Sequence, residues 1–219
     1  MLVLTLFALA ARASDVKSKS VQCEGQTSHY LLFVPDGEGV RPAILLLHGS
    51  GDSPRPMVDA WQALARKEGI VLIAPELPLK PEFETIAPRV FRCEVEDAKQ
   101  SAAIDATRVY VFGNSMGGYL AYDAAAFESE YFAGVAVHAM GIDPQYDGIL
   151  DHARRKTPIA IYMGDHDPLV SLPNVQRTRD LLRKNGFLVH YVEVKNHDHN
   201  YYAVADQVNP DAWKFLKEH

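Results

Sequence analysis

The sequence contains little cysteine, no excess of positive charge and, beyond its first residues, no long apolar run. Two cysteines in 219 residues, Cys23 and Cys93, are too few for a disulfide scaffold and too far apart for a zinc knuckle. The 22 basic residues against 28 acidic ones give a net charge of −6, which does not suggest a nucleic-acid binder. No later stretch has the length and apolarity that a membrane span requires. We therefore expect a soluble protein without a transmembrane helix.

The overall composition is typical of a folded domain. Hydrophobic residues make up 47% of the chain and charged residues 23%, which is too apolar for a disordered chain. A length of 219 residues is ample for one layered α/β structure but leaves little room for a cap domain. We expect residues 14–219 to form a single packed domain.

The N-terminus has the pattern of a secretory signal. An apolar run over 2–11 is followed by Ala11-Arg12-Ala13, the small-x-small form that signal peptidase accepts. No Lys or Arg precedes the run, so the basic start of such signals is missing. The pattern predicts a signal peptide over residues 1–13 and a secreted or periplasmic protein. The alternative is a cytoplasmic protein in which this run is the first apolar element.

Apolar segments typical of buried strands alternate with segments of helical periodicity. Predicted strands lie at 29–34, 43–47, 70–74, 109–112, 134–138, 158–162 and 188–194, and predicted helices at 56–67, 91–103, 117–127, 171–184 and within 201–219. Residues 75–89 hold four prolines and are expected to form a loop. Strands separated by helices predict an α/β fold whose central sheet is mostly parallel and covered by helices on both faces.

In such a sheet, functional residues follow the carboxyl ends of the strands. Directly after the strand at 109–112 comes Gly113-Asn114-Ser115-Met116-Gly117, a Gly-x-Ser-x-Gly pattern between a strand and a helix. A serine on such a sharp turn is exposed for nucleophilic attack, and the glycines leave space for the turn. Ser115 is therefore the candidate nucleophile. The alternative is a small-residue turn that only links two elements.

A serine nucleophile needs hydrogen-bond donors for the oxyanion that it generates. The run His48-Gly49-Ser50-Gly51 follows the strand at 43–47, and its small residues let the Ser50 N–H face the site. The N–H of Met116, the residue after the nucleophile, is the second candidate donor. His48 precedes the serine in the chain, so we interpret it as a structural hydrogen-bonder that shapes this loop rather than as the base.

The acid and the base are expected after the next strands. Asp167 and Asp165 both follow the strand at 158–162, and Asp167 is favoured because Pro168 stiffens the turn that presents its carboxylate. Asp165 is then interpreted as a solvated turn residue. His197 and His199 both follow the last strand, and the residue pattern leaves either one open as the base.

The order Ser115, Asp167, histidine, with His48-Gly49 upstream, resembles the α/β-hydrolase fold. Within that fold the chain is similar to the branch of esterase D (S-formylglutathione hydrolase), feruloyl esterases and polyhydroxybutyrate depolymerase-like proteins, over roughly 28–217. The segment 198–202, Asp-His-Asn-Tyr-Tyr, resembles the Asp-His-Ser-Tyr-Tyr stretch of esterase D, which selects His199. An alternative alignment places His197 at the Gly-His of other hydrolases, although the glycine is absent.

The resemblance implies a serine hydrolase that cleaves carboxylic esters through an acyl-enzyme, with Ser115, His199 and Asp167 as its triad. It implies no organic cofactor and a small-molecule or oligomeric ester as substrate. A metal site is not expected, because the His197-x-His199 pair lacks further ligands. The alternatives are a serine peptidase of the prolyl-oligopeptidase type and a non-catalytic binding protein of the same fold.

Several other positions receive structural interpretations. Cys23 and Cys93 can pair if the protein is exported. His138 is expected to be a core histidine, and Glu94, Glu96 and Asp97 a solvated helix face. The loop at 75–89 and the segment 141–156 are expected to wall the substrate site. The short intervals between the motif residues leave no large lid, so the site should be open and suited to a small or exposed acyl group.

Overall fold

The computed structural model describes residues 15–78 and 88–219, so the predicted signal at 1–13 and most of the predicted loop at 75–89 lie outside the described residues. Eight strands form one sheet in the order β1-β2-β4-β3-β5-β6-β7-β8. Their bounds are β1 (Lys17–Cys23), β2 (Gln26–Phe33), β3 (Arg41–Leu47), β4 (Val71–Pro75), β5 (Ile104–Asn114), β6 (Gly134–His138), β7 (Ile159–Gly164) and β8 (Val189–Val194). Only the pairings of β2 with β1 and β4 are antiparallel. The prediction of a mostly parallel α/β sheet is confirmed.

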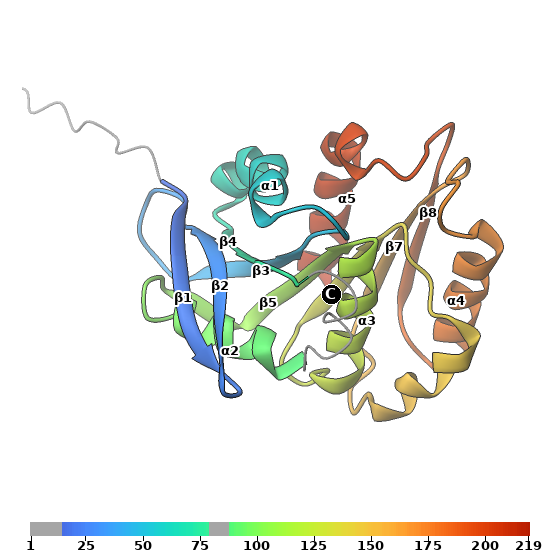
Figure 1. The fold of residues 1–219 in the computed structure, drawn as a ribbon, viewed down its shortest axis with the longest axis horizontal. Helices are drawn as coiled ribbons and strands as arrows, with labels where there is room; N and C mark the ends of the chain where they lie inside the picture. The colour runs from blue at the N-terminus through green and yellow to red at the C-terminus, as the bar shows by residue number, and fades with distance from the viewer. Residues whose placement is uncertain (1–14, 79–87) are drawn as a thin grey trace, which may run out of the picture.

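Helices cover both faces of this sheet (Figure 1). On one face lie α1 (Pro54–Glu68) and α5 (Ala205–Glu218), and on the other lie α2 (Pro88–Ala98), α3 (Met116–Phe127) and α4 (Leu172–Lys184). Two short 3-10 helices, η2 (Pro144–His152) and η3 (Tyr201–Ala203), complete the described elements. No large cap domain stands above the sheet in the described parts of the chain.

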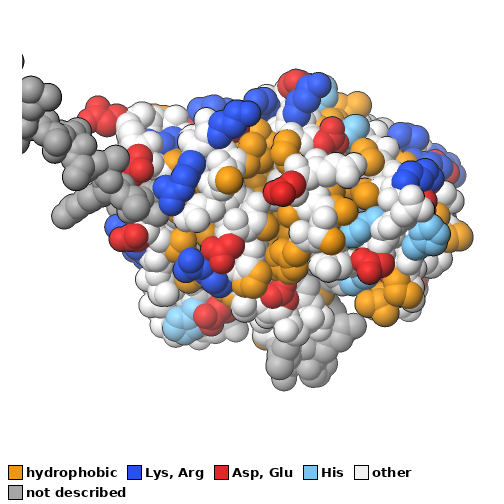
Figure 2. Space-filling view, turned by 90° about the horizontal axis from the view of Figure 1, so that it is seen from above, with side chains coloured by type: hydrophobic (Ala, Val, Ile, Leu, Met, Phe, Trp, Pro, Cys, Tyr) orange, Lys and Arg blue, Asp and Glu red, His pale blue; other side chains and the backbone are white. Residues whose placement is uncertain are grey.

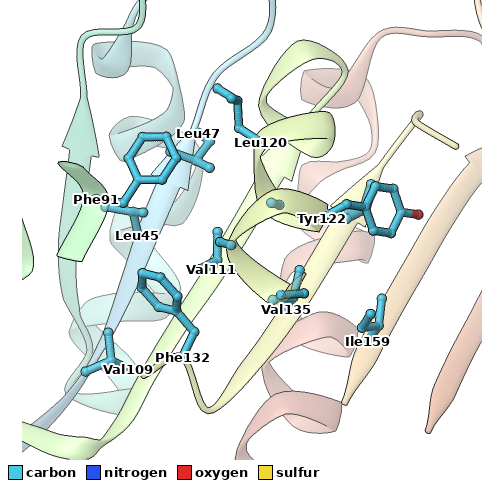
Figure 3. Packing of buried hydrophobic residues seen from close by; sticks show 14 of the residues in the cluster. Leu45, Leu47, Phe91, Val109, Val111, Leu120, Tyr122, Phe132, Val135 and Ile159 are labelled. Atoms are coloured by element: carbon cyan, nitrogen blue, oxygen red, sulfur yellow. The ribbon is translucent and has the colours of Figure 1, made fainter. Parts of the chain in front are cut away.

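The apolar runs explain why the central strands are parallel and buried. Every residue from Pro42 to Leu47 and from Val71 to Pro75 is buried, as expected for strands covered on both faces. The larger core lies between the sheet and α2, α3 and α4, where Leu45 and Val111 face Phe91 and Leu120 (Figure 3). The second core lies beneath α1 and α5. The two cores together pack both faces of the sheet against the helices.

Three expectations differ from the structure. Strand β1 was not predicted, because its sequence, Lys-Ser-Lys-Ser-Val-Gln-Cys, is mostly polar and exposed at the sheet edge. The helix expected at 91–103 runs from Pro88 to Ala98. Glu94 is not on a solvated face: its side chain is 1% exposed, because Val90, Phe91, Val95 and Ala98 place position 94 on the buried stripe of α2.

A disulfide joins the end of β1 to α2. Cys23 and Cys93 are bonded, with their Cα atoms 5.9 Å apart and 70 positions apart in the sequence. The pairing of the two cysteines, which the sequence left open, is therefore present in the structure. It fixes the edge strand to the helix that carries Glu94.

None of the described helices combines the length and apolarity that crossing a membrane would require. On the face that carries α1 and α5, acidic and basic side chains are interspersed, with apolar groups between them (Figure 2). No single sign of charge dominates this face.

Candidate active site

Ser115 occupies a strained turn between β5 and α3. Its φ of 52° and ψ of −116° lie in a region that residues with a side chain rarely adopt. The turn is held by the Ser115 N–H, which donates to the His138 carbonyl at 2.9 Å, and by the Gly118 N–H, which donates to the Ser115 carbonyl at 2.8 Å. A Cβ at Gly113 would lie 2.1 Å from the Gly117 carbonyl oxygen, so only glycine permits so tight a turn. The motif therefore forms the predicted strand-turn-helix.

The loop after β3 lies directly against this turn. A Cβ at Gly117 would lie 2.1 Å from the Leu47 carbonyl oxygen, and one at Gly49 would lie 3.6 Å from the Ser115 Cβ. The glycines of the two motifs thus bring the predicted oxyanion loop to the serine.

His48 fixes the shape of that loop. Its Nδ1 bonds the Gly49 carbonyl oxygen at 2.8 Å, and its Nε2 accepts from the Leu77 N–H at 3.1 Å. The two contacts place the ring proton on Nδ1 and engage both nitrogens. Burial lowers the pKa of His48, which favours the neutral ring. The interpretation of His48 as a structural hydrogen-bonder is confirmed.

Ser115, His199 and Asp167 form a hydrogen-bonded chain, although they come from three separate strand ends. The Ser115 Oγ lies 2.9 Å from the His199 Nε2, and the His199 Nδ1 lies 2.7 Å from the Asp167 Oδ2. The Asp167 side chain is wholly buried, whereas that of His199 is 20% exposed. The serine and the imidazole can therefore meet a ligand while the carboxylate stays shielded from water.

The second oxygen of Asp167 is also held. Its Oδ1 accepts from the backbone N–H groups of Leu169 and Val170 at 2.8 and 2.9 Å. These donors belong to the turn that Pro168 opens, as the sequence interpretation required. Both carboxylate oxygens are thus engaged, and the carboxylate is fixed in orientation.

Asp165, the alternative acid, has another role. The loops after β7 and β8 pack so closely that a Cβ at Gly164 would lie 2.3 Å from the His197 carbonyl oxygen. Burial raises the pKa of Asp165, but hydrogen bonds from the Asn196 and His197 N–H groups outweigh it, so the pKa is lowered overall. With only 18% of its side chain exposed, Asp165 is not the solvated turn residue that was expected. It joins the two loops that carry Asp167 and His199.

His197, the alternative base, lies in the core, and the hydrogen bond to the Ser115 Oγ is made by His199 instead. The His197 ring is buried and lies 5.6 Å from the ring of His138. The Nδ1 of His138 bonds the Asn114 Oδ1 at 2.9 Å, while burial, followed by the nearby His197 and His199, lowers the pKa of His138 to about 3. His138 is a core histidine as expected, but its Nε2 and that of His197 lack partners within the described residues.

The two candidate oxyanion donors come from different segments: Met116 follows Ser115 in the chain, and Ser50 belongs to the loop after β3. Met116 begins α3, so its N–H is among the groups that have no acceptor inside the helix. Ser50 follows Gly49, which lies against Ser115. Within residues 15–78 and 88–219, neither N–H donates a hydrogen bond to another backbone group. Both N–H groups therefore remain available to an external acceptor.

Two features at the site were not predicted. The Tyr202 hydroxyl donates to Asp52, which ties the segment after His199 to the loop after β3. The Asn114 Nδ2 lies 3.3 Å from the position of a Gly49 Cβ, so Asn114 separates His138 from the oxyanion loop. Both features bring together segments that are far apart in the sequence, and the local sequence patterns gave no signal for either.

The arrangement is chemically suited to activating a hydroxyl. A neutral imidazole that accepts from Ser115 can take its proton, and a fixed carboxylate on the other nitrogen stabilises the resulting cation. Nowhere in the described parts of the chain do three His, Cys, Asp or Glu side chains gather in a way that could hold a metal ion.

Comparison with known proteins extends these observations. Residues 44–216 match the model of the family described as "Alpha/beta hydrolase family". The chain is 30% identical over 172 residues to "Putative esterase NocK" of Nocardia uniformis subsp. tsuyamanensis, covering 69% of this chain and 48% of that protein. The chain thus spans about half the length of this relative.

Solved structures share the fold. One similar structure comes from a structural analysis of two fungal esterases from Rhizomucor miehei. It superposes on this chain with a TM-score of 0.76 and 16% sequence identity, and the match covers 94% of this chain and 85% of that one. An S-formylglutathione hydrolase from Staphylococcus aureus superposes with a TM-score of 0.72 and 17% sequence identity, and the match covers 95% of this chain and 99% of that one. At these identities the likeness establishes the fold alone.

Proposed function

The chain belongs to the alpha/beta hydrolase family, and we propose that it is a serine hydrolase that cleaves carboxylic esters. The observation that carries the proposal is the hydrogen-bonded chain from the Ser115 Oγ through His199 to the buried Asp167. The similarity to a protein named as an esterase supports the choice of ester as substrate. We assign residues 14–219 to one hydrolase domain.

In the first half of the reaction, the Ser115 Oγ attacks the acyl carbon while the His199 Nε2 takes its proton. The N–H groups of Met116 and Ser50 bind the oxyanion of the tetrahedral intermediate. The C–O bond of the ester then breaks, and His199 gives the proton to the leaving alcohol. The product of this half is an acyl-enzyme on Ser115.

In the second half, His199 takes a proton from water, and the water oxygen attacks the acyl carbon. Collapse of the second intermediate breaks the bond to Ser115, returns the proton to its oxygen and releases the acid. Asp167 holds the His199 proton on Nδ1, so that Nε2 faces Ser115 as an acceptor. It also stabilises the imidazolium in both halves.

The proposed substrate has a small or exposed acyl group. The segments between Ser115 and Asp167 and between Asp167 and His199 form strands and helices of the core fold. The described residues include no large cap above Ser115. This supports an open site rather than one that encloses a long lipid chain. Small molecules or ester groups on an oligomer fit this proposal.

We also propose that the protein is exported. The Cys23–Cys93 disulfide supports this, because disulfides persist in oxidising compartments and are rare in the cytosol. Fractionation of the native organism, with thiol labelling of the recovered protein, tests the idea. An intact protein with reduced cysteines in the cytosol would contradict it.

The function is tested by hydrolysis of aryl esters of increasing acyl length, beside thioester, feruloyl, polyester and peptide substrates. We expect turnover of short esters and its loss in Ser115→Ala and His199→Ala. Ser53→Ala is the matched control, because Ser53 is exposed and its side chain makes no capping hydrogen bond to α1. Turnover of peptides without esters, or full activity in Ser115→Ala, would contradict the proposal.

A further inference from the structure

A cavity of about 510 Å³ lies apart from Ser115, between the start of β2, the end of β4 and α2. Leu77, Val90 and Phe91 supply apolar walls, while Glu94 and the rim residue Glu76 supply carboxylates. Its volume is that of pockets that hold small organic molecules. The proposed ester chemistry uses none of these side chains.

Glu94 is the unusual member of this lining. Its side chain is 1% exposed, and its Oε1 accepts a hydrogen bond from the Ser28 hydroxyl. Its Oε2 is buried and has no hydrogen-bond partner in the described structure. A buried carboxyl oxygen without a partner is costly, and native proteins rarely keep one without a role.

The position of Glu94 is fixed by the fold. It lies in α2 next to Cys93, whose disulfide to Cys23 anchors the helix to β1. Val90 and Phe91, one turn earlier, bury the same face of the helix. The carboxyl group is therefore held in the cavity wall instead of turning to solvent.

The charges around the cavity favour a cation. Glu94 and Glu76 line it, and no Lys or Arg is among its described lining residues, where His29 is the one basic side chain. A carboxylate that is itself buried, as Glu94 is, interacts with a cation more strongly than it would in water. A hydrogen-bond donor that also carries positive charge would satisfy the unpartnered Oε2.

We propose that this cavity binds an organic cation, an ammonium or amidinium group on an apolar body, through an ion pair with Glu94. The apolar body packs on Leu77, Val90 and Phe91. The site neighbours the oxyanion loop, because the N–H of its wall residue Leu77 bonds His48. The proposal is independent of the ester chemistry, and binding is expected to persist in Ser115→Ala.

The protonation of Glu94 gives the site a signature. Burial raises the pKa of Glu94 to about 8, so the carboxyl is mostly protonated at pH 7 before a cation binds. Cation binding then requires proton release, and affinity should rise about eightfold between pH 7 and pH 8.5. Among the described residues, the other titratable groups near Glu94 are His29 and Tyr30 on β2, Glu76 after β4 and Asp97 on α2.

The test compares 2-phenylethylammonium with its neutral analogue 2-phenylethanol by titration calorimetry on the full chain. We expect the ammonium to bind at least about tenfold more tightly. Glu94→Gln should remove both this preference and the pH effect, since it leaves His29, Tyr30, Glu76 and Asp97 unchanged. Equal binding of the two probes, binding of neither, or an unchanged preference in Glu94→Gln would overturn the proposal.

Two further measurements keep the test decisive. Glu38→Gln removes an exposed carboxylate from the loop between β2 and β3 and should leave binding unchanged, which controls for net charge. Backbone NMR shifts of the unaltered protein provide a second readout if Glu94→Gln does not fold. The ammonium should shift the amides of Thr27 and Val90, and shifts confined to other regions would contradict the site.

Discussion

Replacing Asp167 by Asn tests how the carboxylate controls the protonation of His199. The Asp167 Oδ1 accepts from two backbone N–H groups, those of Leu169 and Val170, so this position must remain an acceptor. The Asn oxygen therefore takes that position, and its NH₂ group faces the His199 Nδ1. Because two donors cannot face each other, His199 adopts the tautomer with its proton on Nε2. That nitrogen then points an N–H at Ser115 and cannot accept the serine proton.

The expected loss is large and falls on the chemical step. A wrong tautomer in this type of triad lowers kcat by about 10⁴, which corresponds to about 5 kcal/mol of transition-state stabilisation. KM should change little, because the wholly buried carboxylate does not reach the substrate. The substitution is nearly isosteric, so the fold should persist.

The assay is the hydrolysis of a short p-nitrophenyl ester under saturating and limiting substrate. Circular dichroism confirms the fold, and Asp180→Asn, which changes an exposed carboxylate on α4, is the matched control. A loss in kcat of less than about tenfold, or one expressed only in KM, would refute the assigned role of Asp167.

Three further predictions concern the fold that holds the site. Replacing both Cys23 and Cys93 by Ser should lower the free energy of unfolding by about 4 kcal/mol, because the disulfide closes a loop of 70 positions; urea unfolding measures this, and a loss below about 1 kcal/mol would contradict it. Burial raises the pKa of Glu94 from its ordinary 4.5 to about 8, so between these values the folded state holds a proton that the unfolded chain has lost. Stability should therefore fall as pH rises through this window, by about 5 kcal/mol, and Glu94→Gln should remove that slope; parallel slopes of the two proteins in urea unfolding would exclude it. Gly117→Ala places a Cβ 2.1 Å from the Leu47 carbonyl oxygen, so it should destabilise the fold by more than about 3 kcal/mol, whereas Gly148→Ala, which has open space, should be tolerated in thermal unfolding.

The sequence predicted the central sheet well, because strands buried on both faces must be continuously apolar. The runs at 43–47 and 70–74 are of this kind, and they correspond to β3 and β4. The edge strand β1 lacks that constraint, since one of its sides has no partner strand. Its polar sequence carries no signal that distinguishes it from a loop.

The sequence predicted those site residues that lie in a recognisable motif or at a characteristic place in the order of the chain. The Gly-x-Ser-x-Gly pattern located Ser115, and the resemblance in segment 198–202 favoured His199, which is the histidine that contacts the serine. The role of Asp165 and the contact between Tyr202 and Asp52 depend on how separate loops pack, which no local pattern encodes. Glu94 was misread although the apolar spacing of α2 placed it on the buried stripe.

The central claim, that Ser115 is a nucleophile activated by His199, is tested most directly by reaction with a fluorophosphonate followed by peptide mass spectrometry. We predict a single covalent adduct on Ser115, formed rapidly in the unaltered protein and in His197→Gln, and strongly slowed in His199→Gln. A folded protein that remains unlabelled, or a Ser115 adduct that forms equally fast without His199, would contradict the claim.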